Sequence, residues 1–153
     1  MQPFQIKGFP MPPSANALYK NKNWDVGGGR EKSQAYRAYE EECVLWSYKN
    51  GYQLQNIRIA ISQLPKNTVF HVERTFYFRA HRIISKAGNP LKNETLGRPK
   101  ALDDCLAKLI GIDDKLFWDD SNKKRPSLHV ALGEYVDIVL TPMGMPVAPE
   151  EVD

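Results

Sequence analysis

The stretch TVFHVERTFYFR, which runs from Thr68 to Arg79, decides the fold class of this chain. It is rich in β-branched and aromatic residues, which strands favour, and we expect it to form the longest strand. Its apolar residues alternate, and the set expected to point inward is Phe70, Val72, Phe76 and Phe78. Arg74 interrupts that inward face, which predicts either a β-bulge or a functional arginine at this position.

The chain before this strand predicts one strand, an extended loop and one helix. Phe4–Gly8 has a strand pattern, and the loop that follows contains Pro12 and Pro13, which cannot donate to a ladder. Ser33 is a suitable N-cap for a helix that ends near Lys49. Its apolar stripe is expected to be Tyr36, Tyr39, Cys43 and Trp46. Asn50-Gly51 ends this helix, with the glycine suited to a left-handed conformation.

Further patterns complete an α+β domain. Alternation over Ile57–Ile61 predicts a strand that pairs with 68–79 as a hairpin, and Ala80–Lys100 reads as a long irregular loop. A short helix is expected over Asp103–Ile110, stopped by Gly111, followed by strands at Ser127–Leu132 and Glu134–Thr141. We therefore expect one small domain over residues 1–142, with a mixed sheet flanked by helices, and a flexible acidic tail over 143–153.

The composition indicates a soluble protein that works inside the cell. The chain has 153 residues, 42% hydrophobic and 25% charged, and a formal net charge of +3. No apolar run approaches the roughly 20 residues that span a bilayer, and we expect no signal peptide. The two cysteines, Cys43 and Cys105, are expected to be reduced core thiols.

Positive charge is concentrated in the predicted loop and beyond it. The loop holds a single acid, Glu94, against six cations: Arg79, Arg82, Lys86, Lys92, Arg98 and Lys100. A cationic loop with glycines can follow a phosphate backbone, since neutralised phosphates release counterions. An ordinary solvated surface loop explains the same composition equally well.

Negative charge follows at once. Six aspartates lie within eighteen residues: Asp103, Asp104, Asp113, Asp114, Asp119 and Asp120. Grouped carboxylates repel one another unless cations compensate, and their hard oxygens suit Mg²⁺ or Mn²⁺. Such an ion activates water and neutralises charge on a phosphate during backbone hydrolysis. Taken singly, the same residues have local explanations as helix caps and turn residues.

Three segments together resemble a known family. Residues 12–19 (PPSANALY) are similar to a Pro-Pro-Ser-x-Asn loop with its following aromatic, and residues 33–39 to the helix after it. Leu102-Asp103-Asp104 with Lys108, and then Trp118-Asp119-Asp120-Ser121, are similar to an acidic helix start and a Trp-x-Asp-Asp segment. In this order they resemble the RusA family of Holliday junction resolvases, the phage-type endodeoxyribonucleases.

This resemblance implies a RusA-like nuclease domain that forms a symmetric homodimer on four-way DNA junctions. It places the protein in the cytoplasm of a bacterium or a phage-infected host cell, at the nucleoid when bound to DNA. The implied ligands of Mg²⁺ (or Mn²⁺) are Asp104 and Asp120, with Asp103 or Asp119 as a further carboxylate. Lys108 would orient water or balance charge on the phosphate. The distribution of positive charge, and not the resemblance, gives the expected DNA contacts: Arg74, Arg79, Arg82, Lys86, Lys92, Arg98, Lys100, Lys123 and Lys124.

The family pattern Asp-x-Asp-Asn-x-x-Lys is matched only in part. Anchored on Lys108, its first aspartate falls on Leu102 and its asparagine on Cys105. Asp103, Asp113 or Asp119 can then complete the site. Two alternatives follow: a catalytically impaired branched-DNA-binding protein of the same fold, and a small structural protein whose acidic and basic segments pair internally.

Overall fold

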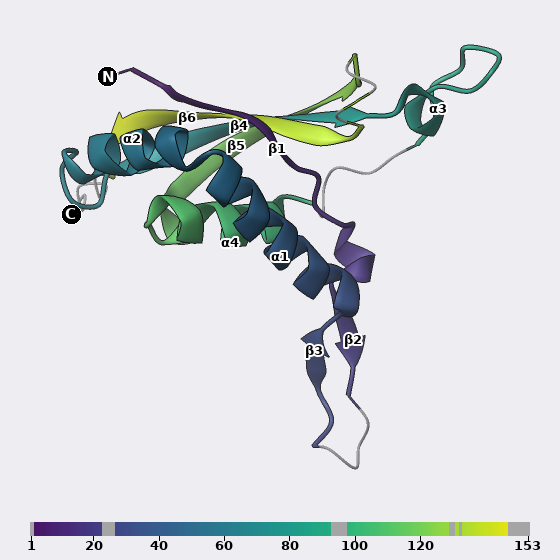
Figure 1. Cartoon of the computed structure of the whole chain (residues 1–153), viewed down its shortest axis with the longest axis horizontal. Coiled ribbons are helices and arrows are strands. Elements are labelled where there is room, and N and C mark those ends of the chain that lie inside the picture. Colours follow the sequence, from purple (N-terminus) through teal and green to yellow (C-terminus); the bar gives the residue numbers. More distant parts are fainter. Residues whose placement is uncertain (1, 23–26, 93–97, 129–130, 132, 147–153) are drawn as a thin grey trace, which may run out of the picture.

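A computed structural model describes residues 2–22, 27–92, 98–128, 131 and 133–146 (Figure 1). The main sheet contains four strands, and a separate two-stranded hairpin projects from the body. The strands are β1 (Phe4–Pro10), β2 (Tyr19–Asn21), β3 (Arg30–Lys32), β4 (Val69–Phe78), β5 (Phe117–Pro126) and β6 (Tyr135–Gly144). The helices are α1 (Gln34–Lys49), α2 (Gly51–Ser62), α3 (Ala80–Ile83) and α4 (Pro99–Ile110), with one-turn 3-10 helices at Ala15–Ala17 and Asp114–Leu116.

The main sheet has the order β1-β6-β4-β5 and is mixed, as expected for an α+β domain. Strand β4 pairs with β6 antiparallel and with β5 parallel, so the segment 68–79 lies in the interior of the sheet. Its predicted inward face is confirmed, because Phe70, Val72, Phe76 and Phe78 are all buried. Arg74 is buried among them without a β-bulge at its position.

Helices α1, α2 and α4 lie on one side of the main sheet (Figure 1). The Ser33 hydroxyl accepts a hydrogen bond from the Tyr36 backbone N–H at 3.1 Å, which caps α1 as predicted. Tyr36, Tyr39 and Cys43 are buried, and Cys43 and Cys105 are free thiols in the core. The amphipathic stripe of α1 therefore closes the core against α4 and β1.

The predicted strand at Ile57–Ile61, and with it the hairpin to 68–79, is wrong, because these residues belong to α2. Leu54, Ile57 and Ile61 are three and four residues apart, so they also satisfy a helical stripe, and the first two are buried. Packing against α4 decides between the two periods. The prediction that Gly51 takes a left-handed conformation is also wrong. Gly51 is the first residue of α2, and its φ is not positive.

The limits of several helices and strands differ from those predicted from the sequence. The Ala80–Lys100 segment contains α3, a bridge between Ile84 and Pro90, and the first turn of α4, which begins at Pro99 instead of Asp103. Gly111 does end α4 in the left-handed conformation, with φ 78°. The strand expected at Ser127–Leu132 is wrong at its described residues, 127, 128 and 131; the strand before them is β5, which begins at Phe117, ten residues earlier, and ends at Pro126. Strand β6 runs to Gly144, so the predicted tail begins later than residue 143. The parts of these predictions that fall on residues 93–97, 129–130, 132 and 147–153 lie outside the described residues.

Candidate metal centre and nucleic-acid interface

A buried guanidinium lies at the centre of the candidate site. Arg74 is 1% exposed and donates to Asp103 from Nε at 3.1 Å and from Nη2 at 2.6 Å. Its Nη1 donates to Asp120 at 2.5 Å and to the Asn122 side-chain oxygen at 3.0 Å. Arg74 therefore joins α4 to the edge strand β5 from within the sheet.

Asp103 is the most enclosed carboxylate of the site, with 18% of its side chain exposed. Burial raises its pKa to about 6, against the opposing attraction of Arg74. Asp120 and Asp114 add further repulsion in the same direction. Asp103, Asp104, Asp114 and Asp120 are called the aspartate cluster below.

Asp104 faces a different direction from its neighbour, because successive residues on a helix are about 100° apart. Its carboxylate accepts a hydrogen bond from the Tyr36 hydroxyl at 2.6 Å, and Tyr36 comes from α1. Asp104 also interacts with Asp114: the pKa of Asp114 is raised, chiefly because its protonated carboxyl can donate a hydrogen bond to Asp104. Two carboxyl groups this close share a proton or attract a cation.

The turn after α4 explains how Asp114 reaches this position. Gly111 takes the left-handed conformation and ends the helix, and Asp113 then caps the 3-10 helix by accepting from the Lys115 N–H at 3.0 Å. The local role predicted for Asp113 as a turn residue is thus confirmed. Asp114 was missed as a site residue by sequence reasoning, since its closeness to Asp104 depends on this turn.

Asp119 and Asp120 point to opposite faces of the sheet. In the parallel register Asp120 lies beside the buried Val72, whereas Asp119 lies beside His71 on the other face. Residues opposite each other in a ladder share a face, and neighbours along a strand alternate. Asp119 accordingly lies within hydrogen-bonding distance of His71 Nδ1. The expectation that Asp119 joins the metal ligands is therefore corrected: it lies across the sheet from the cluster.

The implied lysine also lies elsewhere. Lys108 is 70% exposed and its Nζ lies 3.9 Å from Glu40 on α1. Helical spacing places Lys108 on the side of Asp104, as expected, but its ion pair is with Glu40 and not with the aspartate cluster. Tyr36 occupies the hydrogen-bonding position on Asp104, a role concealed in the sequence because Tyr36 also belongs to the core stripe.

The donor set fits a divalent metal in chemistry but is not arranged as a finished site. Among the described residues, no three His, Cys, Asp or Glu side chains are placed to hold one ion. Carboxylate oxygens are the ligands that Mg²⁺ prefers. Among the described residues, Asp104 and Asp114 are the members of the aspartate cluster that make no ion pair with a cation. Asp103 and Asp120 already share the charge of Arg74.

Two of the expected DNA contacts are interior residues. Arg74 is enclosed as described, and Arg98 is 7% exposed, donates to the Pro12 carbonyl at 2.7 Å and lies 5.2 Å from the Phe78 ring centroid. Burial lowers the pKa of Arg98. Both arginines therefore hold the fold together, and the expectation that they contact DNA is corrected.

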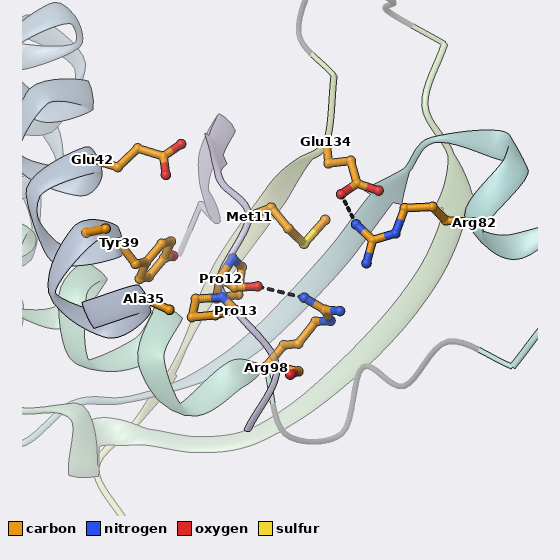
Figure 2. A pocket seen from close by; sticks show the side chains of 11 residues that line it. Met11, Pro12, Pro13, Ala35, Tyr39, Glu42, Arg82, Arg98 and Glu134 are labelled. Carbon is orange, nitrogen blue, oxygen red and sulfur yellow. Dashed lines mark hydrogen bonds and ion pairs between the residues drawn. The ribbon is translucent and has the colours of Figure 1, made fainter. Parts of the chain in front are cut away.

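Arg98 also lines a cleft of about 430 Å³ between the proline-rich loop and α1 (Figure 2). Figure 2 shows Arg82 paired with Glu134 on the far side of this cleft, and Arg98 reaching the Pro12 carbonyl. Glu42 contributes a second acid to the walls, so the cleft carries both signs of charge. This balance does not favour a polyanion inside it.

The remaining predicted contacts lie on the surface. Arg79, Lys86, Lys92 and Lys100 are exposed, and Arg79 flanks Glu134 through its backbone N–H at 3.0 Å. Lys123 pairs with Glu73 at 2.6 Å on the face of Asp119, whereas the register places Lys124 beside Phe76 on the face of the aspartate cluster. These cations are thus divided between the α3 segment, the start of α4 and both faces of β5, where Lys123 is exposed and Lys124 is half-buried.

Compared with known proteins, the chain matches no family model and no curated sequence. Among the described residues, no helix is long and apolar enough to cross a membrane.

Proposed function

We propose that this protein is a Mg²⁺- or Mn²⁺-dependent endodeoxyribonuclease that cuts branched DNA, of the junction-resolvase type, acting in the cytoplasm as a homodimer. The observation that carries the proposal is the convergence of Asp103, Asp104, Asp114 and Asp120 from three chain segments. Such a group of carboxylates is costly without a metal and suited to phosphodiester chemistry with one.

In this proposal Asp104 and Asp114 would hold the metal, and Asp120 on β5 would supply a further carboxylate. Asp120 is 47% exposed, so it can contact an ion without leaving Arg74. Arg74 and Tyr36 act as positioning residues that fix the carboxylates before DNA arrives. The metal would lower the pKa of a bound water and neutralise charge on the phosphate. A two-fold dimer suits a four-way junction because equivalent strands are cut symmetrically.

Neighbouring aspartates supply matched controls for the test. We expect Asp120→Asn to reduce metal-dependent junction cleavage by about 100-fold or more with binding retained, and Asp119→Asn to leave cleavage unchanged. The same contrast is expected between Asp114→Asn and Asp113→Asn, since Asp113 only caps the 3-10 helix. Equal losses in both members of a pair would contradict the proposed ligands.

One observation favours a second candidate, a non-cleaving protein that binds branched DNA. Arg74 already forms ion pairs with Asp103 and Asp120, and this reduces the need for a metal. The second candidate predicts salt-sensitive junction binding with no nicking at any Mg²⁺ or Mn²⁺ concentration. A cleavage assay with metal titrated, and binding measured on the same junction, separates the two.

A further inference from the structure

We propose that β5 pairs with β5 of a second copy of this chain, antiparallel and centred on Asn122, so that each copy supplies Lys124 to the aspartate cluster of the other. Strand β5 forms one edge of the main sheet and pairs with β4. Among the described residues, no strand lies on its outer side. The pairing itself needs no nuclease activity, and only the role given to Lys124 rests on the proposed function.

The outer side of β5 is an open edge. An edge strand presents backbone N–H and C=O groups that can pair with another chain, and charged side chains on the edge usually oppose such pairing. Strand β5 is ten residues long, and Asp119, Asn122, Lys123 and Arg125 on it are exposed. Which pairings these charges oppose depends on their order along the strand.

The charges of β5 are complementary to the same charges read in reverse. Antiparallel pairing centred on Asn122 places Asp119 opposite the partner's Arg125, and Asp120 opposite the partner's Lys124. Two-fold symmetry repeats each of these pairs. Parallel pairing in register would instead set aspartate against aspartate and lysine against lysine, and like charges directly opposite each other are destabilising. The order of the charges therefore selects the antiparallel arrangement.

Neighbouring registers pair the charges less well. Centred on Ser121, only Asp119 meets a cation, the partner's Lys123, while Asp120 meets the partner's Asn122. Centred on Lys123, that lysine meets its own copy and neither aspartate meets a cation. A slip by one residue would set the inner face of one copy beside the outer face of the other. The register centred on Asn122 is thus the favoured one.

The outer face of β5 supplies the first of these pairs. Asp119 lies beside His71 and Arg125 beside Tyr77, so both are on the face away from the helices. Arg125 Nη1 donates to the carbonyl of Lys124 at 2.8 Å, and Arg125 makes no ion pair among the described residues. In the dimer, directly opposed Cβ atoms would be about 5 Å apart, which brings this guanidinium to the partner's Asp119.

The inner face of β5 carries the second pair into the aspartate cluster. Asp120 lies beside Val72 and Lys124 beside Phe76, and both of these β4 residues are buried under the helices. The side chain of Asp120 is 47% exposed although it binds Arg74, so the partner's Lys124 can approach it. A second cation there would contact a phosphate held at the cluster.

The same pairing fixes how the two clusters are related. A two-fold axis perpendicular to the sheet keeps the helices of both copies on one side, the side that α1, α2 and α4 cover in Figure 1. The two Asp120 residues would be separated by four residues along the ladder, which is about 14 Å at about 3.4 Å per residue. Both clusters would therefore face the same DNA molecule.

The first experiment measures the oligomeric state of the full chain by sedimentation equilibrium, without DNA or metal. We expect wild type to dimerise, and Arg125→Asp, which sets two aspartates opposite each other, to weaken the dimer by about tenfold or more. The double variant Asp119→Arg/Arg125→Asp restores opposite charges and should dimerise like wild type. Lys7→Asp is the matched control, because Lys7 is exposed on β1 at the other edge of the sheet. Charge reversal is needed, since a neutral residue removes one weak attraction and leaves the backbone ladder intact.

The second experiment tests the contribution of Lys124 across the dimer. Asp120→Asn and Lys124→Gln should each reduce junction nicking on their own. Mixed in equal amounts they should recover about a quarter of wild-type nicking, because half of the dimers are mixed and each of these has one complete site. If Lys124 acts within its own chain, the mixture recovers nothing, and its proposed role is wrong.

Three sedimentation results would overturn the pairing. They are a monomeric wild type, a dimer that Arg125→Asp leaves unchanged, and a double variant no better than Arg125→Asp although its melting temperature equals that of wild type. Absence of nicking by wild type would reject the nuclease, and with it the role of Lys124. Sedimentation still decides the dimer in that case, so the two failures are distinguishable.

Discussion

Replacing Arg74 with methionine tests whether the guanidinium is the cation that holds the aspartate cluster together. Methionine keeps much of the length and apolar volume of the side chain while removing four hydrogen bonds, three of them to carboxylates. Arg74 is 1% exposed and Asp103 has 18% of its side chain exposed, so this part of the interaction is a buried pair. Breaking one side of such a pair costs about 3–5 kcal/mol.

Two features of the site place the expected loss at the lower end of that range. Asp120 is 47% exposed, so solvent screens its interaction with Arg74 and it adds little. Asp103 already has a pKa raised to about 6, and without Arg74 it takes up a proton more readily. We therefore expect a loss of about 3 kcal/mol at pH 8 and a smaller loss at pH 5, where Asp103 is neutral.

The assay is urea denaturation of wild type and Arg74→Met at pH 5 and pH 8, with and without Mg²⁺. Arg125→Met is the control, because Arg125 is exposed on the neighbouring strand and should change stability by less than about 0.5 kcal/mol. If Mg²⁺ binds the cluster, it should stabilise the Arg74→Met variant more than wild type. A loss below about 1 kcal/mol at pH 8, or an equal loss at both pH values, would refute the reasoning.

Three further outcomes follow from the same contacts. Because burial raises the pKa of Asp103 from 3.8 to about 6, the folded protein holds a proton that the unfolded chain has released in this window. The free energy of unfolding of wild type should thus fall relative to Asp103→Asn as pH rises from about 4 to 6, and parallel profiles in denaturation would contradict this. Tyr36→Phe removes only the 2.6 Å hydrogen bond to Asp104 and should cost about 1–2 kcal/mol, measured by denaturation; a neutral effect would mean that the bond is not formed in solution. Ser33→Ala removes the N-cap of α1 and should cost about 1 kcal/mol of stability, seen as a lower melting temperature. An unchanged melting temperature would mean that the N-cap does not stabilise the protein.

The local chemistry of the chain determined its best-predicted elements. Strand 68–79, the capped helix after Ser33 and the stop at Gly111 follow from alternation, capping and a left-handed glycine, which act over a few residues. Arg74 was singled out from the sequence because it interrupts an apolar face, which predicted a β-bulge or a functional arginine at this position. Its partners, Asp103 and Asp120, belonged to the acidic stretch that the sequence had already marked.

The edge strand β5 shows where sequence patterns stop being informative. Its residues, from Phe117 to Pro126, are mostly polar and charged, and they form a strand because β4 offers them a ladder on one side. An edge strand that is exposed on its other side needs no apolar alternation, so nothing in its composition predicts it. The prediction for α2 was wrong for the opposite reason, since its isoleucines fit both the two-residue period of a strand and the 3.6-residue period of a helix.

The membership of the aspartate cluster was decided by tertiary structure. Sequence reasoning identified an acidic stretch suited to a metal and gave Asp120 as a ligand, but it kept Asp119 as a candidate further carboxylate and left Asp114 out of the site. The parallel register of β5 sends Asp119 to the opposite face, and the turn after Gly111 brings Asp114 to Asp104. The sequence determines which charges are present and which local elements form. Which charges meet depends on strand register and helix direction, because these are set by packing between segments distant in the chain.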